Sequence, residues 1–206
     1  NSLVSVWQDG KCRLIPNAFG EFLTPSVVSL DDNGELLVGR PAKERLISHP
    51  ERTVSNFKQF MGTKMSYTLA DRLFYPEDLS SFILRQLKDD AVAFLGEEVT
   101  EAVISVPAYF NDQQRSATKN AGKLAGLKVD RIINEPSAAA LAHQCEDEED
   151  GTYLVFDFGG GTLDISVVEM FANIVDIVSV AGNNHLGGTD IDNMIVDKFL
   201  NENKKL

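Results

Sequence analysis

The most informative stretch of the sequence is FDFGGGTLD, residues 156–164, in which three glycines separate two strand-like segments. Glycine has no Cβ, so this loop can approach an anion closely and adopt positive φ, with successive amides pointing at phosphate oxygens. Asp157 ends the incoming strand, Thr162 offers a hydroxyl, and Asp164 lies in the outgoing strand. Carboxylates repel phosphate unless a cation lies between them, and magnesium suits that position. The stretch therefore predicts a phosphate-binding hairpin with a magnesium ion beside it.

The glycine loop does not match two other common nucleotide-binding motifs. No Gly-Lys-Ser or Gly-Lys-Thr follows the glycines, which excludes a Walker loop. The glycines of the dinucleotide fingerprint open a helix, whereas residues 163–168 alternate as a strand. The remaining alternative is a glycine-rich hairpin that binds no ligand. The two aspartates with a threonine between them favour a nucleotide.

The segment before the loop has the pattern of an α/β protein. Leu79, Ile83, Leu87 and Ala91 recur at intervals of four after Pro76 and predict a long helix that ends before Gly96. Strand, helix, strand and helix then follow, which predicts parallel pairing in an α/β sheet. The predicted elements are a helix over 76–95, a strand over 102–106, a helix capped by Asn111-Asp112 and reaching Gly126, a strand over 129–133, and an alanine-rich helix from Ser137 to His143 or beyond.

The segments before residue 76 and after residue 150 show mainly strand patterns, followed by a helical pattern at the C-terminal end. Asp9-Gly10 is a strong hairpin signal between strands predicted over 2–7 and 11–16. Residues 26–75 show only short mixed segments. Residues 2–6 resemble residues 163–167, which suggests a weak internal repeat. The later predicted elements are strands over 153–158, 163–169 and 174–180, a helix through Ile191, Ile195, Val196 and Phe199, and a helical end over 199–206.

Composition excludes several classes of protein. The chain has 206 residues, of which 43% are hydrophobic, and a formal charge of -12 without a dense basic stripe, which argues against a nucleic-acid surface. The two cysteines show no spacing typical of a disulfide framework or metal site. No apolar run is long enough to cross a bilayer, and no secretion signal opens the chain. The sequence therefore predicts a cytoplasmic globular protein without a membrane role.

Glu135 is a second candidate for site chemistry. It is predicted to end a strand just before the helix that begins at Pro136. Ligands bind at this end of the strands in parallel sheets, so Glu135 could orient a water or a metal-bound water. As a plain helix-start acid, it would only interact favourably with the helix dipole. The residues alone leave both interpretations open.

Three further segments carry weaker signals. Residues 105–115 are explained by a strand end, aromatic packing and cap chemistry, and Lys58 resembles an ordinary surface lysine. The turn over 182–190 contains Gly187 and Gly188 before a helical pattern, where a phosphate or ribose could bind. His185, in the same turn, is interpreted as a turn or surface histidine.

The order of four segments carries a family resemblance. Residues 106–115, 134–142, 157–164 and 186–190 resemble, in this order, motifs of the nucleotide-binding domain of the seventy-kilodalton heat-shock chaperones of the DnaK type. The resemblance covers essentially the whole chain, and the short segment between Met61 and Tyr75 favours the compact HscC-like branch. It implies an actin-like (ribonuclease-H-like) ATPase fold of two lobes, here incomplete at both ends.

The resemblance also implies a domain layout. The boundary between the lobes is expected at the acidic run over 146–150. The implied parts are a first lobe over 1–147, with a core subdomain over 1–25 and 76–147 and an outer subdomain over 26–75, and a second lobe over 148–206, with a core subdomain over 148–186 and the start of an outer subdomain over 187–206.

Site roles follow from the resemblance by position. ATP or ADP with magnesium is the implied ligand, and potassium is a further candidate. The implied catalytic residues are Lys58, near the γ-phosphate and the attacking water, Glu135, Asp157 and Thr162. The implied phosphate contacts are Gly159, Gly160, Gly161, Thr162, Gly187 and Gly188. The implied metal residues are Asp157, Asp164 and, through water, Glu135. Pro107 and Arg115 are implied to form a switch toward a peptide-binding domain.

The implied partners are those of a chaperone: a peptide-binding domain of the same chain, unfolded client peptides, a J-domain co-chaperone and a nucleotide exchange factor. Three departures from the family are noted. Its first phosphate loop is expected before Asn1, the rest of the second lobe after Leu206, and Thr189 replaces a glutamate. The chain by itself is therefore expected to bind ATP poorly and to be a weak ATPase or none.

Three alternatives remain. A bacterial actin-like filament ATPase shares the glycine hairpin, but the segment VPAYFND, residues 106–112, favours the chaperone. A sugar kinase of the same superfamily is disfavoured because no sugar-binding acid is evident. A binding module without catalysis is the third.

Overall fold

The computed structural model describes residues 1–147, 150–171, 174–183 and 186–203. Contacts between Cα atoms divide the chain into two compact units. The first unit comprises residues 1–104 and 111–132, and the second comprises residues 105–110 and 133–206. His185, residues 148 and 149 of the acidic run, and residues 204–206 of the predicted helical end lie outside the described residues.

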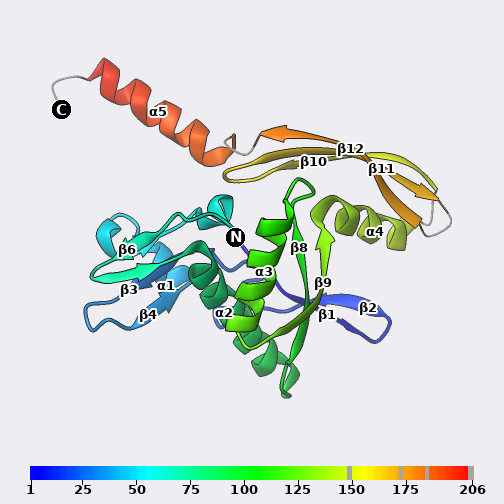
Figure 1. Cartoon of the computed structure of the whole chain (residues 1–206), viewed down its shortest axis with the longest axis horizontal. Helices are drawn as coiled ribbons and strands as arrows, with labels where there is room; N and C mark the ends of the chain where they lie inside the picture. Colours follow the sequence, from blue (N-terminus) through cyan, green and yellow to red (C-terminus); the bar gives the residue numbers. More distant parts are fainter. Residues whose placement is uncertain (148–149, 172–173, 184–185, 204–206) are drawn as a thin grey trace. The chain divides into compact units, whose positions relative to one another are not determined.

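Short strands dominate the N-terminal part of the chain, and helices alternate with strands only from α2 to β10 (Figure 1). The N-terminal part contains β1 (Ser5–Gln8), β2 (Lys11–Leu14), β3 (Val28–Leu30), β4 (Leu36–Val38), α1 (Arg40–Lys43), η1 (Pro50–Arg52), β5 (Thr53–Val54), η2 (Phe57–Phe60), β6 (Tyr67–Leu69) and β7 (Arg72–Phe74). The remainder contains α2 (Pro76–Leu95), β8 (Glu101–Val106), α3 (Asp112–Leu124), β9 (Lys128–Asn134), α4 (Glu135–Asp147), β10 (Gly151–Phe158), β11 (Leu163–Phe171), β12 (Ile174–Asn183) and α5 (Gly188–Glu202).

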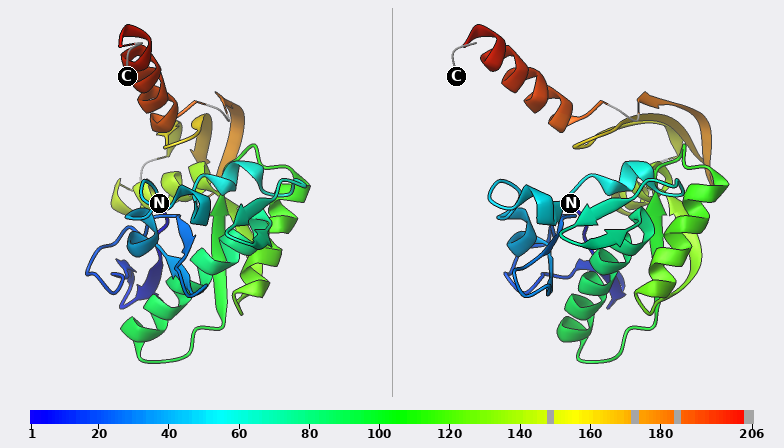
Figure 2. Two further views of the ribbon diagram at one scale, coloured as in Figure 1. Left: turned by 90° about the vertical axis from the view of Figure 1, so that its left-hand side faces the viewer. Right: turned by 60° about the vertical axis from the view of Figure 1, so that its left-hand side comes forward.

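Helix α2 organises the first unit, and its bounds are those predicted. The backbone N–H of Tyr75 donates to the Asp78 carboxylate at 2.8 Å before Pro76, and Gly96 ends the helix with φ 73°. The four residues of the predicted apolar stripe are all buried. Three of them, Leu79, Ile83 and Leu87, meet residues from β3, β5, η2 and β6 in one core. Helix α3 packs beside α2, as Figure 2 shows. The core members are Val28, Leu30, Val54, Phe57, Leu69, Leu79, Ile83 and Leu87.

Strands β8 and β9 are hydrogen-bonded neighbours joined through α3. Figure 1 shows them running in the same direction, as the strand-helix-strand order predicts. Asn111 caps α3 as predicted, because its side-chain oxygen accepts from the Gln114 N–H at 2.9 Å. A Cβ at Gly122 would collide with Val129, so a glycine is required for α3 to approach β9.

The second unit is built on an antiparallel sheet in the order β10-β11-β12. Helix α4 covers one face, where Ala140 packs with Val168 and Met170 of the central strand. The other face leaves apolar side chains exposed, among them Leu154 and Phe156 on β10. Helix α5 buries none of its residues. Exposed apolar surface of this kind is typical of a region that packs against other protein.

The structure corrects two of the predictions about local structure, confirms a third and leaves the lobe boundary untested. The first strand begins at Ser5, so only two residues of the first copy of the internal repeat lie in a strand, whereas residues 163–167 lie wholly in β11. Glu135 begins α4 and does not end β9. The antiparallel hairpin of β1 and β2 is confirmed, with Asp9 and Gly10 at φ 54° and 77°. The lobe boundary at residues 147 and 148 stays a prediction.

Candidate functional site

The glycine loop is a tight turn between β10 and β11. The Gly159 N–H donates to the Thr162 carbonyl at 2.9 Å and closes the turn. The predicted positive φ is wrong for two of the glycines, because neither Gly159 nor Gly160 has a φ between +20° and +160°. A Cβ at either position would meet only ordinary contacts within the chain. The absence of side chains instead leaves the outer surface of the loop open to a ligand.

The second glycine turn lies directly against the first. A Cβ on Gly187 would fall inside the Gly160–Gly161 peptide. Two backbone bonds join the turns: the Gly188 N–H donates to the Gly159 carbonyl at 3.1 Å, and the Thr189 N–H donates to the Gly160 carbonyl at 2.8 Å. The structure thus brings together two predicted phosphate-binding segments and places the N-terminus of α5 beside the glycine loop, where the helix dipole favours an anion.

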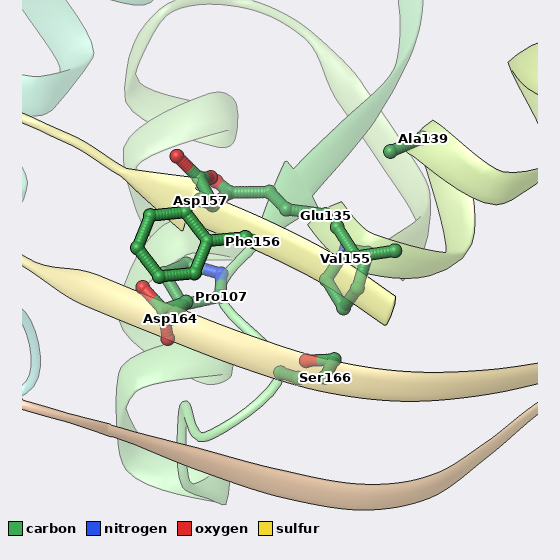
Figure 3. A pocket seen from close by; sticks show the side chains of 10 residues that line it. Pro107, Glu135, Ala139, Val155, Phe156, Asp157, Asp164 and Ser166 are labelled. Carbon is green, nitrogen blue, oxygen red and sulfur yellow. The ribbon is translucent and has the colours of Figure 1, made fainter. Parts of the chain in front are cut away.

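A cavity of about 200 Å³ lies within the second unit. We call it the acidic pocket, because three of its lining side chains are carboxylates from α4, β10 and β11 (Figure 3). The figure shows Glu135 extending from the start of α4 toward Asp157. The lining residues are Pro107, Ala108, Glu135, Pro136, Ala139, Val155, Phe156, Asp157, Asp164 and Ser166.

The electrostatics of the acidic pocket favour a cation. Asp157 and Asp164 are direct cross-strand partners, and like charges in such positions are destabilising unless something neutralises them. Asp164 is buried, and none of the described residues that line the pocket is basic. Among the described residues, no group of three or more His, Cys, Asp or Glu side chains could hold a metal ion directly. A hydrated ion such as Mg²⁺, which usually keeps several of its waters, fits this donor set.

Tyr109 is a site residue that the sequence reasoning missed. Burial is the main cause that raises the pKa of its phenol to about 12; the charges of Asp164, Glu135 and Asp157 contribute to the rise, and a hydrogen bond with the Thr162 side chain opposes it. Tyr109 therefore lies among the three acids and contacts the last residue of the glycine loop. The available signal was its place in the VPAYFND segment, which had been explained by aromatic packing; Tyr109 does pack edge-on against Phe110.

The raised pKa of Tyr109 predicts a loss of stability in alkali. Above about pH 10 the phenol ionises in the unfolded chain but stays protonated in the folded one. The native state then binds more protons, so the free energy of unfolding falls as pH rises from 10 toward 12. Tyr109→Phe should make this fall less steep, as measured by urea unfolding at about pH 9, 10 and 11 with a chelator present. The exposed Tyr75→Phe is the control, and equal slopes for all three proteins would contradict the assignment.

The remaining predicted site residues lie elsewhere. Lys58 lies in the first unit on η2. Phe57, the first residue of η2, and Met61, which follows its last residue, are both buried. The charge of Lys58 acts on the backbone nitrogen of Asn1, so Lys58 lies near Asn1. Arg115 lies on α3 in the first unit, whereas Pro107 lines the acidic pocket in the second.

Comparison with known proteins decides the family. The family model described as Hsp70 protein matches residues 1–72 and 64–206. The chain belongs to the Hsp70 family. Chaperone protein DnaK from Thermotoga petrophila and from Thermotoga maritima are each 49% identical to it over 208 residues, and DnaK from Thermotoga neapolitana is equally similar. The resemblance seen in the sequence is therefore confirmed, and the fold it implies is the actin-like ATPase fold.

The extent of the match bears on the predicted HscC-like branch. The alignment covers 100% of this chain but 35% of each relative, so the chain spans about a third of their length. The alignment is only two positions longer than the chain, so these DnaK relatives carry no long insertion between Met61 and Tyr75. The shortness of that segment therefore does not distinguish the HscC-like branch, which stays a prediction.

Proposed function

We propose that the chain forms part of the ATP-binding and ATP-hydrolysing domain of a molecular chaperone. One observation carries the proposal: the glycine loop, the N-terminus of α5 and the acidic pocket adjoin one another in the second unit. Gly159, Gly187 and Gly188 donate their N–H groups within the two turns and fix the shape of the paired loops. The other backbone N–H groups of the glycine loop suit the phosphates, and a carboxylate pair suits the counter-ion that phosphates require. Family membership and the similarity to chaperone protein DnaK support a chaperone and do not favour a filament-forming ATPase.

The proposed roles divide the reaction between two kinds of group. Gly159, Gly160, Gly161 and Thr162, together with Gly187 and Gly188, bind and orient the phosphates. Asp157, Asp164 and Glu135 accept hydrogen bonds from water around the cation, and Tyr109 holds the Thr162 side chain. When bound, magnesium supplies neutralisation of phosphate charge. Lys58 adds a positive charge near the γ-phosphate, so most of the catalysis is positioning and charge neutralisation.

The wider function is proposed on the same basis. We propose two lobes, a cytoplasmic location, and Pro107 with Arg115 as a switch toward a peptide-binding domain. The proposed partners are client peptides, a J-domain co-chaperone and a nucleotide exchange factor, with potassium as a second cation near Asp164. None of the described helices is long and apolar enough to cross a membrane.

The test uses the full-length protein, since the chain spans only a third of its relatives. Binding of ATP in the presence of magnesium, slow hydrolysis, and faster release of a labelled unfolded peptide when ATP is added are expected. Sedimentation with ATP tests the alternative. Polymers that form with ATP, combined with peptide release that ignores nucleotide, would overturn the chaperone and support a filament ATPase.

A further inference from the structure

Ser166 is a buried polar residue of the acidic pocket to which the proposed function assigns no role. It is 1% exposed and lies in β11, the central strand of the sheet. Its Oγ is buried and has no hydrogen-bond partner within the described part of the chain. The residue lines the acidic pocket, as do Pro136 and Ala139 of α4, and Figure 3 shows it on the strand that also carries Asp164. An unsatisfied buried hydroxyl is costly, so a native protein normally provides it with water or a ligand.

The alternation of β11 supports a role for Ser166 in binding. In a sheet that is covered on one face, apolar residues normally point to the cover and polar residues to solvent. Here the order is reversed at the loop end of β11: Asp164 and Ser166 are buried, whereas Leu163, Ile165 and Val167 are only half-buried. Polar residues in buried positions break the local rule, and such departures are expected at functional sites.

The position of Ser166 limits which ligands its hydroxyl could bind. Asp164 and Ser166 lie two residues apart on one strand, so both side chains lie on the same face of the sheet as Asp157, the partner of Asp164. A hydroxyl can donate one hydrogen bond and accept two, which suits a water molecule that must also satisfy a carboxylate. The hydrated cation of the proposed function presents such waters.

We propose that Ser166 is a positioning residue that holds a water molecule in the hydration shell of the divalent cation in the acidic pocket. The inference rests on the proposed function. Ser166 marks the most buried polar end of the pocket, and Asp157, which is exposed, marks the open end. The hydroxyl therefore orients the cation through water from the inside, while the carboxylates supply the charge.

The test measures binding of Mn²⁺ alone to the full-length protein by electron paramagnetic resonance. Ser166→Ala should weaken Mn²⁺ binding about three- to tenfold, the effect of losing one hydrogen bond. Ser166→Cys, which keeps the volume but bonds weakly, should behave like Ser166→Ala. Ser179→Ala is the matched control, because Ser179 is exposed on the neighbouring strand and pairs with Val167 on the opposite face.

A second readout separates binding from folding. Without cation, Ser166→Ala should melt at or above the wild-type temperature, since the substitution removes an unsatisfied hydroxyl; with Mn²⁺ it should gain less in melting temperature than the wild type. Wild-type affinity in both serine-166 variants would overturn the role of Ser166 and leave the proposed function standing. Failure of the wild type itself to bind Mn²⁺ would overturn the cation site and, with it, this inference.

Discussion

Gly187→Ala should weaken nucleotide binding by the full-length protein about 10- to 100-fold. The new Cβ would overlap the Gly160–Gly161 peptide, and a backbone cannot yield as a flexible side chain can. The glycine loop and the start of α5 would have to separate, which breaks the bonds that Gly188 and Thr189 donate to the loop. Two such bonds correspond to about 1–3 kcal/mol, which is the expected loss in affinity if the paired loops bind phosphate. Titration with a fluorescent ADP analogue measures it.

The neighbouring glycine provides the control. Within the described part of the chain, no atom lies within 4 Å of a Cβ built on Gly188, and the φ of Gly188 lies outside the left-handed range. The proposed role of Gly188 rests on its backbone, which alanine keeps together with the bond to the Gly159 carbonyl. Gly188→Ala should therefore bind nucleotide within about threefold of the wild type, since alanine also suits a first helical turn. Equal affinities for both variants would show that the close approach of the two loops does not matter for nucleotide binding.

The elements that could be predicted from the sequence carry their signals locally. Helix α2 has a stripe at intervals of four, a proline at its first position and a glycine after its last, and its predicted bounds match the structure. The hairpin of β1 and β2 was predicted because Asp9-Gly10 accepts the positive φ that a two-residue turn needs. In both cases the deciding residues lie within one element or one turn.

The strands within residues 26–75 could not be predicted because each forms only by pairing with strands elsewhere in this region. Strand β3 has three residues and pairs with β4 and β5, and the hydroxyls of Ser29 and Thr53, 24 residues apart, are hydrogen-bonded at 2.9 Å. Strands of two or three residues are too short for alternation to show. Their positions are fixed by the shared core with α2, which no local pattern reveals.

The candidate site was predicted in its parts but not in its assembly. The sequence indicates both glycine turns, yet the requirement for glycine lies at Gly187, where two loops meet, and not in a positive φ at Gly159 or Gly160. Alternation alone would point Asp164 and Ser166 to solvent, whereas both are buried. Contacts between segments far apart in sequence therefore decide which residues of a recognised motif matter.

Lys58→Ala should slow single-turnover ATP hydrolysis by the full-length protein about 100- to 1,000-fold, the usual cost of removing one preorganised charge from a transition state. Nucleotide affinity should fall far less, because the glycine loop and the acidic pocket remain. The variant should fold normally: Lys58 is exposed on η2, and the buried Phe57 and Met61 fix that turn. Rapid mixing with radiolabelled ATP separates the hydrolysis step from binding.

A second lysine tests whether position or charge alone is responsible. Lys64 is exposed and lies six positions further along the same segment, so Lys64→Ala removes the same charge without removing the proposed contact. Lys64→Ala should hydrolyse ATP at the wild-type rate. If both variants lose hydrolysis equally, the effect is a general field of positive charge; if neither does, Lys58 has no part in the reaction. Only a loss of hydrolysis confined to Lys58→Ala supports a positioned ammonium group near the γ-phosphate. That loss should also persist at high salt, because salt screens a diffuse field much more than it screens a positioned contact.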